Sequence, residues 1–369
     1  MFVLESFEVY RVALPLIYPF RTAFGNDEAI ESILVKIKSN DMEGWGEAAP
    51  WKYPAYSSEF AAGAFIVIRD FLIPLISGKN FKSGKELQNA MDSIKGNYFA
   101  KAAIDLAWWD LYAKKMGKPL WKVLGGQKDV VDVGADYGVM DTIDDLIEMI
   151  SQAIKMGYKR IKLKFRPGWD IQMIRTVRKI FPDHVFHIDC NSAYKLDDID
   201  MFKEIDKYNL AMIEQPLMHD DLIDHAFLQD KIKTPVCLDE SITSPQKALK
   251  AAQIKACKYV NIKPGRVGGL TKALEIHDIC EKNNIPCWVG GMLESSIGAN
   301  HCIALATKRN IKYPSDIFPT QRFYKKDIGV PEIKLCGHSQ IKANGSPGIG
   351  AIPDDILLKK YAIEYITIR

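Results

Sequence analysis

The sequence predicts an α/β protein in which a (β/α)7–8 TIM-type barrel is joined to an N-terminal α+β capping domain that the C-terminal tail completes. Three observations support this prediction. The first fifty residues alternate apolar and polar side chains, as antiparallel strands do. After Gly125-Gly126, short apolar or β-branched runs alternate with helix-length segments, which is typical of a parallel β/α fold. The final residues, 361–368, are strand-like again.

Residues 1–125 form the predicted capping domain. A turn at Asn40-Asp41 separates two of its strands, and Gly117-Lys118-Pro119 ends its last helix. The predicted strands are Phe2–Leu14, Glu31–Lys38 and Glu43–Ala49, and the predicted helices are Ser58–Ile76 and Phe99–Met116.

Residues 126–320 form the predicted barrel, and residues 321–369 form a segment that returns to the capping domain. Eight strands separated by helices are expected in the barrel. They are Val131–Val139, Arg160–Phe165, Val185–Cys190, Ala211–Glu214, Val236–Leu238, Tyr259–Ile262, Pro286–Val289 and Tyr313–Asp316.

Composition narrows the classes of function. The 49 basic and 46 acidic residues leave a net charge of +3, without the basic cluster that nucleic-acid binding requires. No run approaches the ~20 apolar residues of a membrane helix, and the N-terminus does not resemble a signal peptide. The seven cysteines include no C-x-x-C pair, which favours buried free thiols and a cytoplasmic location. We therefore expect neither a nucleic-acid nor a membrane partner.

Five charged residues mark the predicted active site. Each lies at the C-terminal end of a predicted strand, and successive separations are 25, 25, 25 and 24 residues, about one β/α unit. The C-terminal strand ends of a β/α barrel meet at one rim, so these side chains should converge there. They are Lys164, Asp189, Glu214, Asp239 and Lys263.

The chemistry of this set points to a hard metal ion. Three neighbouring carboxylates (Asp189, Glu214 and Asp239) repel one another unless a cation joins them, and oxygen ligands suit Mg²⁺ or Mn²⁺ rather than zinc. Alternation in Ile161–Phe165 places Lys162 and Lys164 on the inner face of the barrel. A lysine beside such a metal can remove the proton α to a carboxylate of a small-molecule substrate.

The motifs at these positions resemble those of the enolase superfamily, and the resemblance extends over the whole chain. A lysine on the second and on the sixth strand is the pattern of the muconate-cycloisomerase subgroup. The matching segments are Lys162-Leu163-Lys164, Asp189-Cys190-Asn191, Ile213-Glu214-Gln215-Pro216, Asp239-Glu240-Ser241 and Lys263-Pro264-Gly265.

Within that subgroup, several loops are similar to those of o-succinylbenzoate synthases and N-succinylamino acid racemases. Examples are the segments 19–25, 191–194, 263–269 and 346–350. Dipeptide epimerases carry Asp-x-Asp at the eighth strand, whereas Asp316-Ile317-Phe318 lacks the second aspartate. The Pro-Gly-Asp-Ile-Ser motif of the synthase/racemase group is also altered here, to Pro314-Ser315-Asp316-Ile317-Phe318. The resemblance implies a lyase that dehydrates its substrate in menaquinone biosynthesis, with racemase activity, Mg²⁺ and a homo-oligomeric state.

The resemblance also implies residue roles. Lys164 is the acid/base on one face of the substrate and Lys263 lies on the other. Arg266 either depresses the pKa of Lys263 through like charge or binds a carbonyl.

For the remaining candidates two interpretations stay open. Lys162 and Asn191 support the metal ligands or serve barrel packing, and Glu240 either contacts the ligands or caps a loop. Glu294 faces the pocket or sits at a helix N-terminus. Phe20, Phe24 and Tyr56 close over the substrate or pack within loops. Two functions compete with the synthase: a muconate-type cycloisomerase or dipeptide epimerase, and a non-catalytic barrel that survives as a binding protein.

Overall fold

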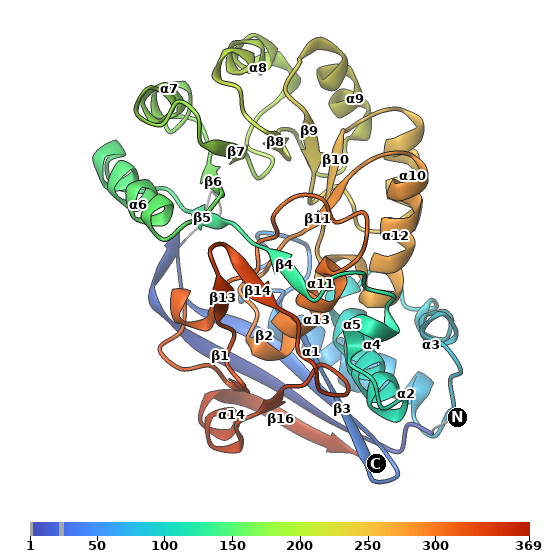
Figure 1. The fold of residues 1–369 in the computed structure, drawn as a ribbon. Coiled ribbons are helices and arrows are strands. Elements are labelled where there is room, and N and C mark those ends of the chain that lie inside the picture. The colour runs from blue at the N-terminus through green and yellow to red at the C-terminus, as the bar shows by residue number, and fades with distance from the viewer. Residues whose placement is uncertain (1–2, 22–25) are drawn as a thin grey trace.

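The computed structural model describes residues 3–21 and 26–369, which form two units that share a continuous apolar core (Figure 1). The N-terminal unit is built on a four-stranded sheet in the order β16-β1-β2-β3. All three of its strand pairs are antiparallel. Its strands are β1 (Ser6–Arg21), β2 (Asn26–Ser39), β3 (Met42–Ala48) and β16 (Ala362–Ile368).

Helix α4 (Tyr98–Lys115) packs directly on β3. Glycines allow this close approach, because a Cβ at Gly44 or Gly46 would lie 2.2 or 2.3 Å from a carbonyl oxygen of α4. The single helix predicted over 58–76 is wrong in detail, since it is interrupted by a π-helical turn over Ile68–Leu72. Pro74 has no N–H to continue the α-helical ladder there. The helices on either side of this turn are α1 (Ala61–Val67) and α2 (Ile73–Ile76). The remaining helices of the N-terminal unit are α3 (Gly84–Met91) and α5 (Leu120–Val123).

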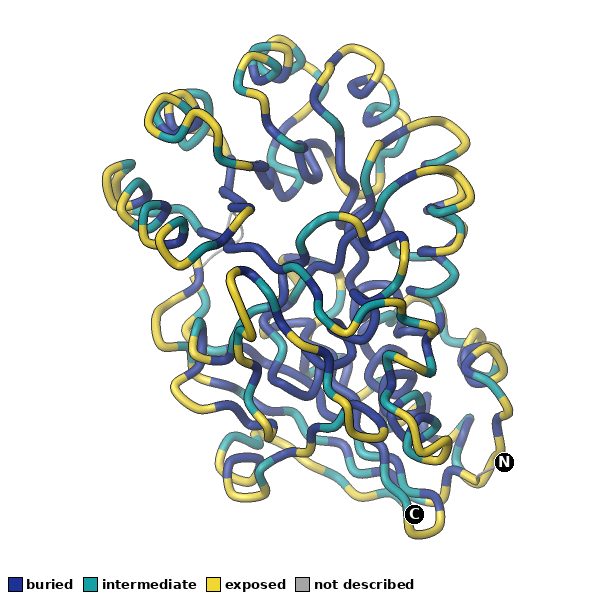
Figure 2. Tube along the Cα trace, viewed as in Figure 1, coloured by how far each residue is buried: buried dark blue, intermediate teal, exposed yellow. Residues whose placement is uncertain are grey.

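The second unit is a curled, seven-stranded parallel sheet in the order β5 to β11, with helices on its outer side (Figure 1). The strands are dark blue and buried in Figure 2, whereas the outer helices alternate buried and exposed faces. The strands are β5 (Ala135–Tyr137), β6 (Arg160–Lys164), β7 (Val185–Asp189), β8 (Ile213–Glu214), β9 (Val236–Leu238), β10 (Tyr259–Ile262) and β11 (Cys287–Val289).

The helices of this unit follow its strands in alternation. They are α6 (Ile143–Lys155), α7 (Ile171–Ile180), α8 (Ile199–Ile205), α9 (Leu222–Lys231), α10 (Pro245–Gln253), α11 (Pro264–Val267), α12 (Leu270–Lys282) and α13 (Ser296–Ala306), with 3-10 turns at Leu196–Asp198, Asp206–Tyr208 and Thr320–Arg322.

Two predicted strands differ in the structure. The first, 131–139, is split into β4 (Val130–Asp132) and β5 around Gly134. The Arg160 guanidinium occupies the space where a Gly134 side chain would be, 2.1 Å from the ideal Cβ. The eighth, 313–316, is not a ladder strand, because Pro314 lacks an N–H to donate. Single bridges still connect this region to both edges of the sheet, Val133 to Ser315 and Cys287 to Ile311.

The C-terminal segment contacts both units. Strand β14 (Gln340–Lys342) pairs with β13 (Leu335–Gly337) and with β4, while β16 pairs with β1. The same segment contains β12 (Gly329–Val330), which precedes β13, and β15 (Ile352–Pro353) and α14 (Asp355–Tyr361), which lie between β14 and β16. None of the helices in residues 3–21 and 26–369 combines the length and hydropathy of a membrane-spanning segment.

Candidate active site

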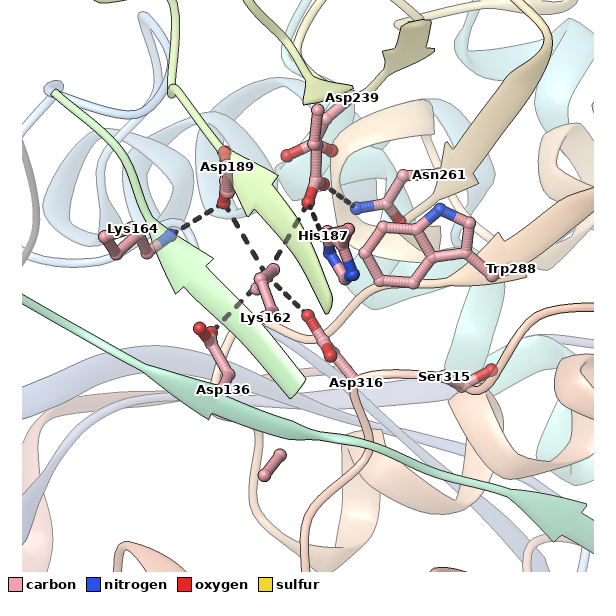
Figure 3. A network of polar contacts seen from close by, with 12 residues as sticks. Asp136, Lys162, Lys164, His187, Asp189, Asp239, Asn261, Trp288, Ser315 and Asp316 are labelled. Atoms are coloured by element: carbon pink, nitrogen blue, oxygen red, sulfur yellow. Dashed lines mark hydrogen bonds and ion pairs between the residues drawn. The ribbon is translucent and has the colours of Figure 1, made fainter. Parts of the chain in front are cut away.

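The five charged residues with the 25-residue spacing lie at the C-terminal ends of neighbouring strands. Figure 3 shows three of them, Lys164, Asp189 and Asp239. Strand register aligns Lys164 with Asp189 and Asp189 with Glu214. Asp239 and Lys263 directly follow β9 and β10. All five are at least 90% buried. The equal spacing therefore corresponds to one rim of the parallel sheet.

Lys164 is held by the strand beside it. Its Nζ donates to Asp189 Oδ2 at 2.7 Å and to Asn191 Oδ1 at 3.0 Å. Burial would raise the pKa of Asp189, but Lys164 and Lys162 outweigh it and hold this pKa well below its usual range. Asn191 also donates to Glu240 Oε1 at 3.1 Å. Burial, followed by the charge of Asp189, raises the pKa of Glu240 to about 7.

Lys263 lies in a second group around Asp239. Its Nζ donates to Asp239 Oδ2 at 2.9 Å and sits 4.5 Å from the centroid of the Tyr56 ring. Arg266 donates to the other oxygen of Asp239, to Tyr56 Oη at 3.0 Å and to the Asn261 carbonyl at 2.6 Å. Burial lowers the pKa of Lys263, but nearby acidic groups led by Tyr56 outweigh it, so the net shift is upward. Arg266 thus binds both a carbonyl and a carboxylate, and in this arrangement Lys263 favours its charged form.

Lys162 lies between the two groups and is surrounded by four carboxylates (Figure 3). Its Nζ is 2.5 Å from Asp316 Oδ2 and 3.4 Å from Asp136 Oδ2. The distances to Asp189 and Glu214 are 3.6 and 3.8 Å. These charges raise the pKa of Lys162 well above its usual value despite burial, which alone would lower it.

The carboxylate of Glu214 is oriented by two residues of other strands in the sheet, Asn261 on β10 and His187 on β7. Asn261 Nδ2 donates to Glu214 Oε1 at 2.6 Å, and His187 Nε2 lies 3.5 Å from Oε2. His187 Nδ1 is hydrogen-bonded to the Tyr313 hydroxyl at 3.0 Å. Glu214 Oε2 itself is buried without a hydrogen-bond partner. One acceptor of this carboxylate is therefore left for a further ligand.

The donor set fits a hard divalent cation. Asp189, Glu214 and Asp239 offer only carboxylate oxygens, the ligands that Mg²⁺ and Mn²⁺ prefer. Buried oxygens of Glu214 and Glu240 have no hydrogen-bond partner, which is consistent with a missing positive group. In the structure lysines neutralise Asp189 and Asp239, and the three carboxylates do not form a compact cluster with all ligand atoms within 4.8 Å of one another.

Among the described residues, 3–21 and 26–369, the one compact group of metal-ligand types is His277, Asp278 and Glu281. Both ring nitrogens of His277 are already used, one with Asp278 at 2.8 Å and the other by the Asn310 N–H at 3.1 Å. Glu281 is paired with Arg309 at 2.8 Å. Internal bonds thus account for this group.

A cavity beside Lys164 and Lys263 has an aromatic wall from the N-terminal unit. Phe20, Trp51 and Tyr56 line it together with Leu293 and Phe318. Phe20 and Tyr56 thus line the same cavity as Lys164 and Lys263, whereas Phe24 lies outside the described residues. Gly291 also lines the cavity, so no side chain fills the end of β11 there.

Glu294 lines a neighbouring cavity with Cys302 and Tyr324. This cavity shares the lining residues Leu293, Asp316 and Phe318 with the one that contains the lysines. Its carboxylate accepts from the Met292 N–H at 2.8 Å. Burial raises its pKa. Glu294 therefore supports the loop that carries Leu293, and its cavity adjoins the one that contains the lysines.

Several residues at the site were not among the sequence candidates, including Trp51, Asp136 and Asp316. Asp136 on β5 is paired with Lys162 on β6, so the two side chains point to the same face of the sheet. The prediction that Lys162 points into the barrel could therefore have identified Asp136 as well. Asp316 pairs with Arg160 at 2.7 Å, a contact across 156 residues that no local pattern reveals. Trp51 adopts φ +68°, a left-handed conformation rare for a large side chain.

Comparisons with known proteins identify the family of the chain. Residues 6–125 match the family model of the mandelate racemase/muconate lactonizing enzyme N-terminal domain. Residues 145–356 match the enolase C-terminal domain-like family.

Relatives of known name match over most of their length. An o-succinylbenzoate synthase from Geobacillus kaustophilus is 43% identical, over 93% of this chain and 92% of the relative. An N-succinylamino acid racemase from Thermus thermophilus is 38% identical, over 88% of each chain. The crystal structure of an enolase superfamily member from Listeria innocua superposes with a TM-score of 0.96 at 36% identity, over 100% of this chain and 99% of that one. The chain therefore belongs to the enolase superfamily, with the N- and C-terminal domains of its mandelate racemase/muconate lactonizing enzyme branch.

Proposed function

We propose that this protein is a Mg²⁺-dependent o-succinylbenzoate synthase that also racemises N-succinylamino acids. The observation that carries the proposal is the position of Lys164 and Lys263, which line one cavity from different strands, each beside a carboxylate. The named relatives support the choice of substrate, since synthases and racemases are both found among them.

In this proposal the parallel sheet and the segment 311–316 make up the (β/α)7–8 barrel, which spans 126–320. Residues 1–125 and the tail 321–369 cap it, as the pairing of β16 with β1 supports. The substrate is a small-molecule carboxylate. The seven free cysteines, six of them buried, support a reducing compartment such as the cytoplasm, and we expect a homo-oligomer.

Asp189, Glu214 and Asp239 would hold the Mg²⁺. The bound ion supplies positive charge that lowers the free energy of the enediolate and so makes an α-proton removable near neutral pH. Lys162 remains charged among its four carboxylates and adds to this positive field.

In the lyase reaction, Lys164 as a neutral amine takes the α-proton and then gives a proton to the departing hydroxyl, which leaves as water. Lys263 stays protonated and faces the negative charge that develops on the substrate. The upward shift in the pKa of Lys263 supports this role. In the racemase reaction, one lysine removes the α-proton from one face and the other delivers a proton to the opposite face.

The test is a substrate panel with the purified protein and Mg²⁺. The hydroxycyclohexadiene carboxylate precursor should give an aromatic absorbance, and N-succinylamino acids should exchange their α-proton in D₂O. A dipeptide and a muconate are assayed in parallel. Lys164→Ala and Lys263→Ala should each lose about 10²- to 10⁴-fold in rate. The exposed Lys203→Ala, a matched lysine on α8, should lose nothing.

Failure to convert the precursor, combined with efficient turnover of the dipeptide or the muconate, would contradict the proposal and identify the epimerase or the cycloisomerase instead. The non-catalytic barrel would be favoured if neither the wild-type protein nor Lys164→Ala converted any substrate of the panel and if both bound these substrates with the same affinity.

A further inference from the structure

Asp136 lines the cavity and has one buried carboxylate oxygen without a hydrogen-bond partner. Asp136 is 6% exposed and lies on β5, aligned with Lys162 on β6. Its Oδ2 forms an ion pair with Lys162 at 3.4 Å, while its Oδ1 is buried and has no hydrogen-bond partner. Asp136 lines the same cavity as Lys164 and Lys263, and Figure 3 shows its carboxylate beside Lys162. A residue with an unpaired acceptor is therefore part of the cavity wall.

An unpaired carboxylate oxygen requires a hydrogen-bond donor from the ligand that binds beside it. An ionised carboxylate only accepts hydrogen bonds, and leaving one buried and unpaired costs free energy that a donor recovers. The carboxylates of the substrate are themselves acceptors, so they do not provide this donor.

The neighbouring cation does not supply the missing bond either. The Nζ of Lys162 lies closest to Asp316, at 2.5 Å, and shares its charge among four carboxylates. Arg322 approaches Asp136 as well, but its Nη2 donates to the backbone carbonyl at 3.0 Å, not to the side chain. Oδ1 of Asp136 thus receives no hydrogen bond from either neighbour and is free to accept one.

We propose that Asp136 is a specificity-determining residue, whose free carboxylate oxygen accepts a hydrogen bond from the amide N–H of an N-acylamino acid substrate. This inference rests on the proposed function, because an N-acylamino acid has a single amide N–H. Its nitrogen is bonded to the α-carbon, the atom whose proton the lysines move. A charge-assisted hydrogen bond of this kind favours the amide substrate by about ten- to a hundredfold.

The test compares N-succinyl-L-alanine with O-succinyl-L-lactate, an ester in which oxygen replaces the N–H. The α-proton exchange of each is followed by NMR in D₂O with Mg²⁺, and kcat/KM is determined for wild-type protein, Asp136→Ala and Asp136→Asn. The ratio of amide to ester is compared between proteins, so intrinsic differences in acidity between the two substrates cancel. Asp141→Asn is the matched control, an exposed aspartate beyond the same strand.

We expect Asp136→Ala to reduce the amide-to-ester ratio by about ten- to a hundredfold, whereas Asp141→Asn leaves it unchanged. Thermal unfolding verifies that each variant is folded, and Asp136→Asn, which keeps the side-chain volume, serves if the alanine variant is not. An equal loss with both substrates would mean that Asp136 only supports Lys162, and it would overturn the inference while leaving the proposed function intact. If the wild-type protein exchanges neither substrate, the racemase function and this inference both fail.

Discussion

Glu47 on β3 accepts hydrogen bonds from both the N–H and the hydroxyl of Ser295, at 3.1 and 2.5 Å, across 248 residues of sequence. It also accepts from the Gly298 N–H at 2.9 Å. Ser295 is the N-cap of α13. A carboxylate of the N-terminal sheet thus caps a helix that packs on the parallel sheet, and it fixes the position of one unit on the other.

This contact predicts a pH dependence of stability. Burial raises the pKa of Glu47 to about 7, from an ordinary value of 4.5, against the effect of its hydrogen bonds. The folded state therefore binds more protons than the unfolded state between those values, so the free energy of unfolding should fall as the pH rises from about 4.5 to 7.

The variant Glu47→Gln should remove this part of the slope, an effect of up to about 3 kcal/mol. Urea unfolding at pH 5 and pH 8 measures it. An identical difference between the two pH values in wild-type protein and variant would contradict the prediction.

Asp316→Asn should be strongly destabilising. Asp316 is the counter-charge of two buried cations, Arg160 at 2.7 Å and Lys162 at 2.5 Å. Removing one partner of a buried pair costs about 3–5 kcal/mol. Urea unfolding is the measurement, with Asp200→Asn as the control, since Asp200 pairs with Lys203 at 2.9 Å on the surface and should contribute under about 1 kcal/mol. Equal effects of the two substitutions would refute this account.

Metal affinity should depend on the residues around Glu214. Asn261→Ala removes the 2.6 Å hydrogen bond to Glu214 and should weaken Mg²⁺ or Mn²⁺ binding about 10- to 100-fold. Calorimetric titration of protein treated with EDTA measures the affinity. The control variant His277→Ala removes the buried histidine of the group that contains Asp278 and Glu281, and this variant should bind the ion like the wild type. Retained affinity in Asn261→Ala would exclude the proposed placement of the metal.

Trp51 should affect substrate binding more than the chemical step. Its Nε1–H donates to the Met292 carbonyl at 3.0 Å, next to Leu293, which has φ +60°. Trp51→Phe removes this bond, worth about 1 kcal/mol. We expect KM to rise about fivefold with little change in kcat. Trp109→Phe loses a comparable bond, to Thr271 at 2.9 Å, away from the cavity, and should leave KM unchanged. A fall in kcat with constant KM would disprove the role.

The rim of the site was predictable because charged residues interrupt apolar strands at a constant spacing, and strand register brings Lys164, Asp189 and Glu214 side by side. The structure of the eighth strand was not predictable, because Pro314 reduces it to single bridges. The pairing of Asp316 with Arg160 was not predictable either. It depends on Gly134, whose missing side chain leaves the space that the Arg160 guanidinium occupies. Local periodicity reveals strands and their faces, but not which side chains from separate elements meet.

The pairing of β16 with β1 has a consequence for aggregation. Strand β16, Ala362–Ile368, pairs with β1 although the two strands lie far apart in the sequence. Whenever β16 is detached, the backbone N–H and C=O groups along that side of β1 are unpaired and can bond to a strand of another molecule. The pairing of β16 therefore protects β1 against edge-to-edge association.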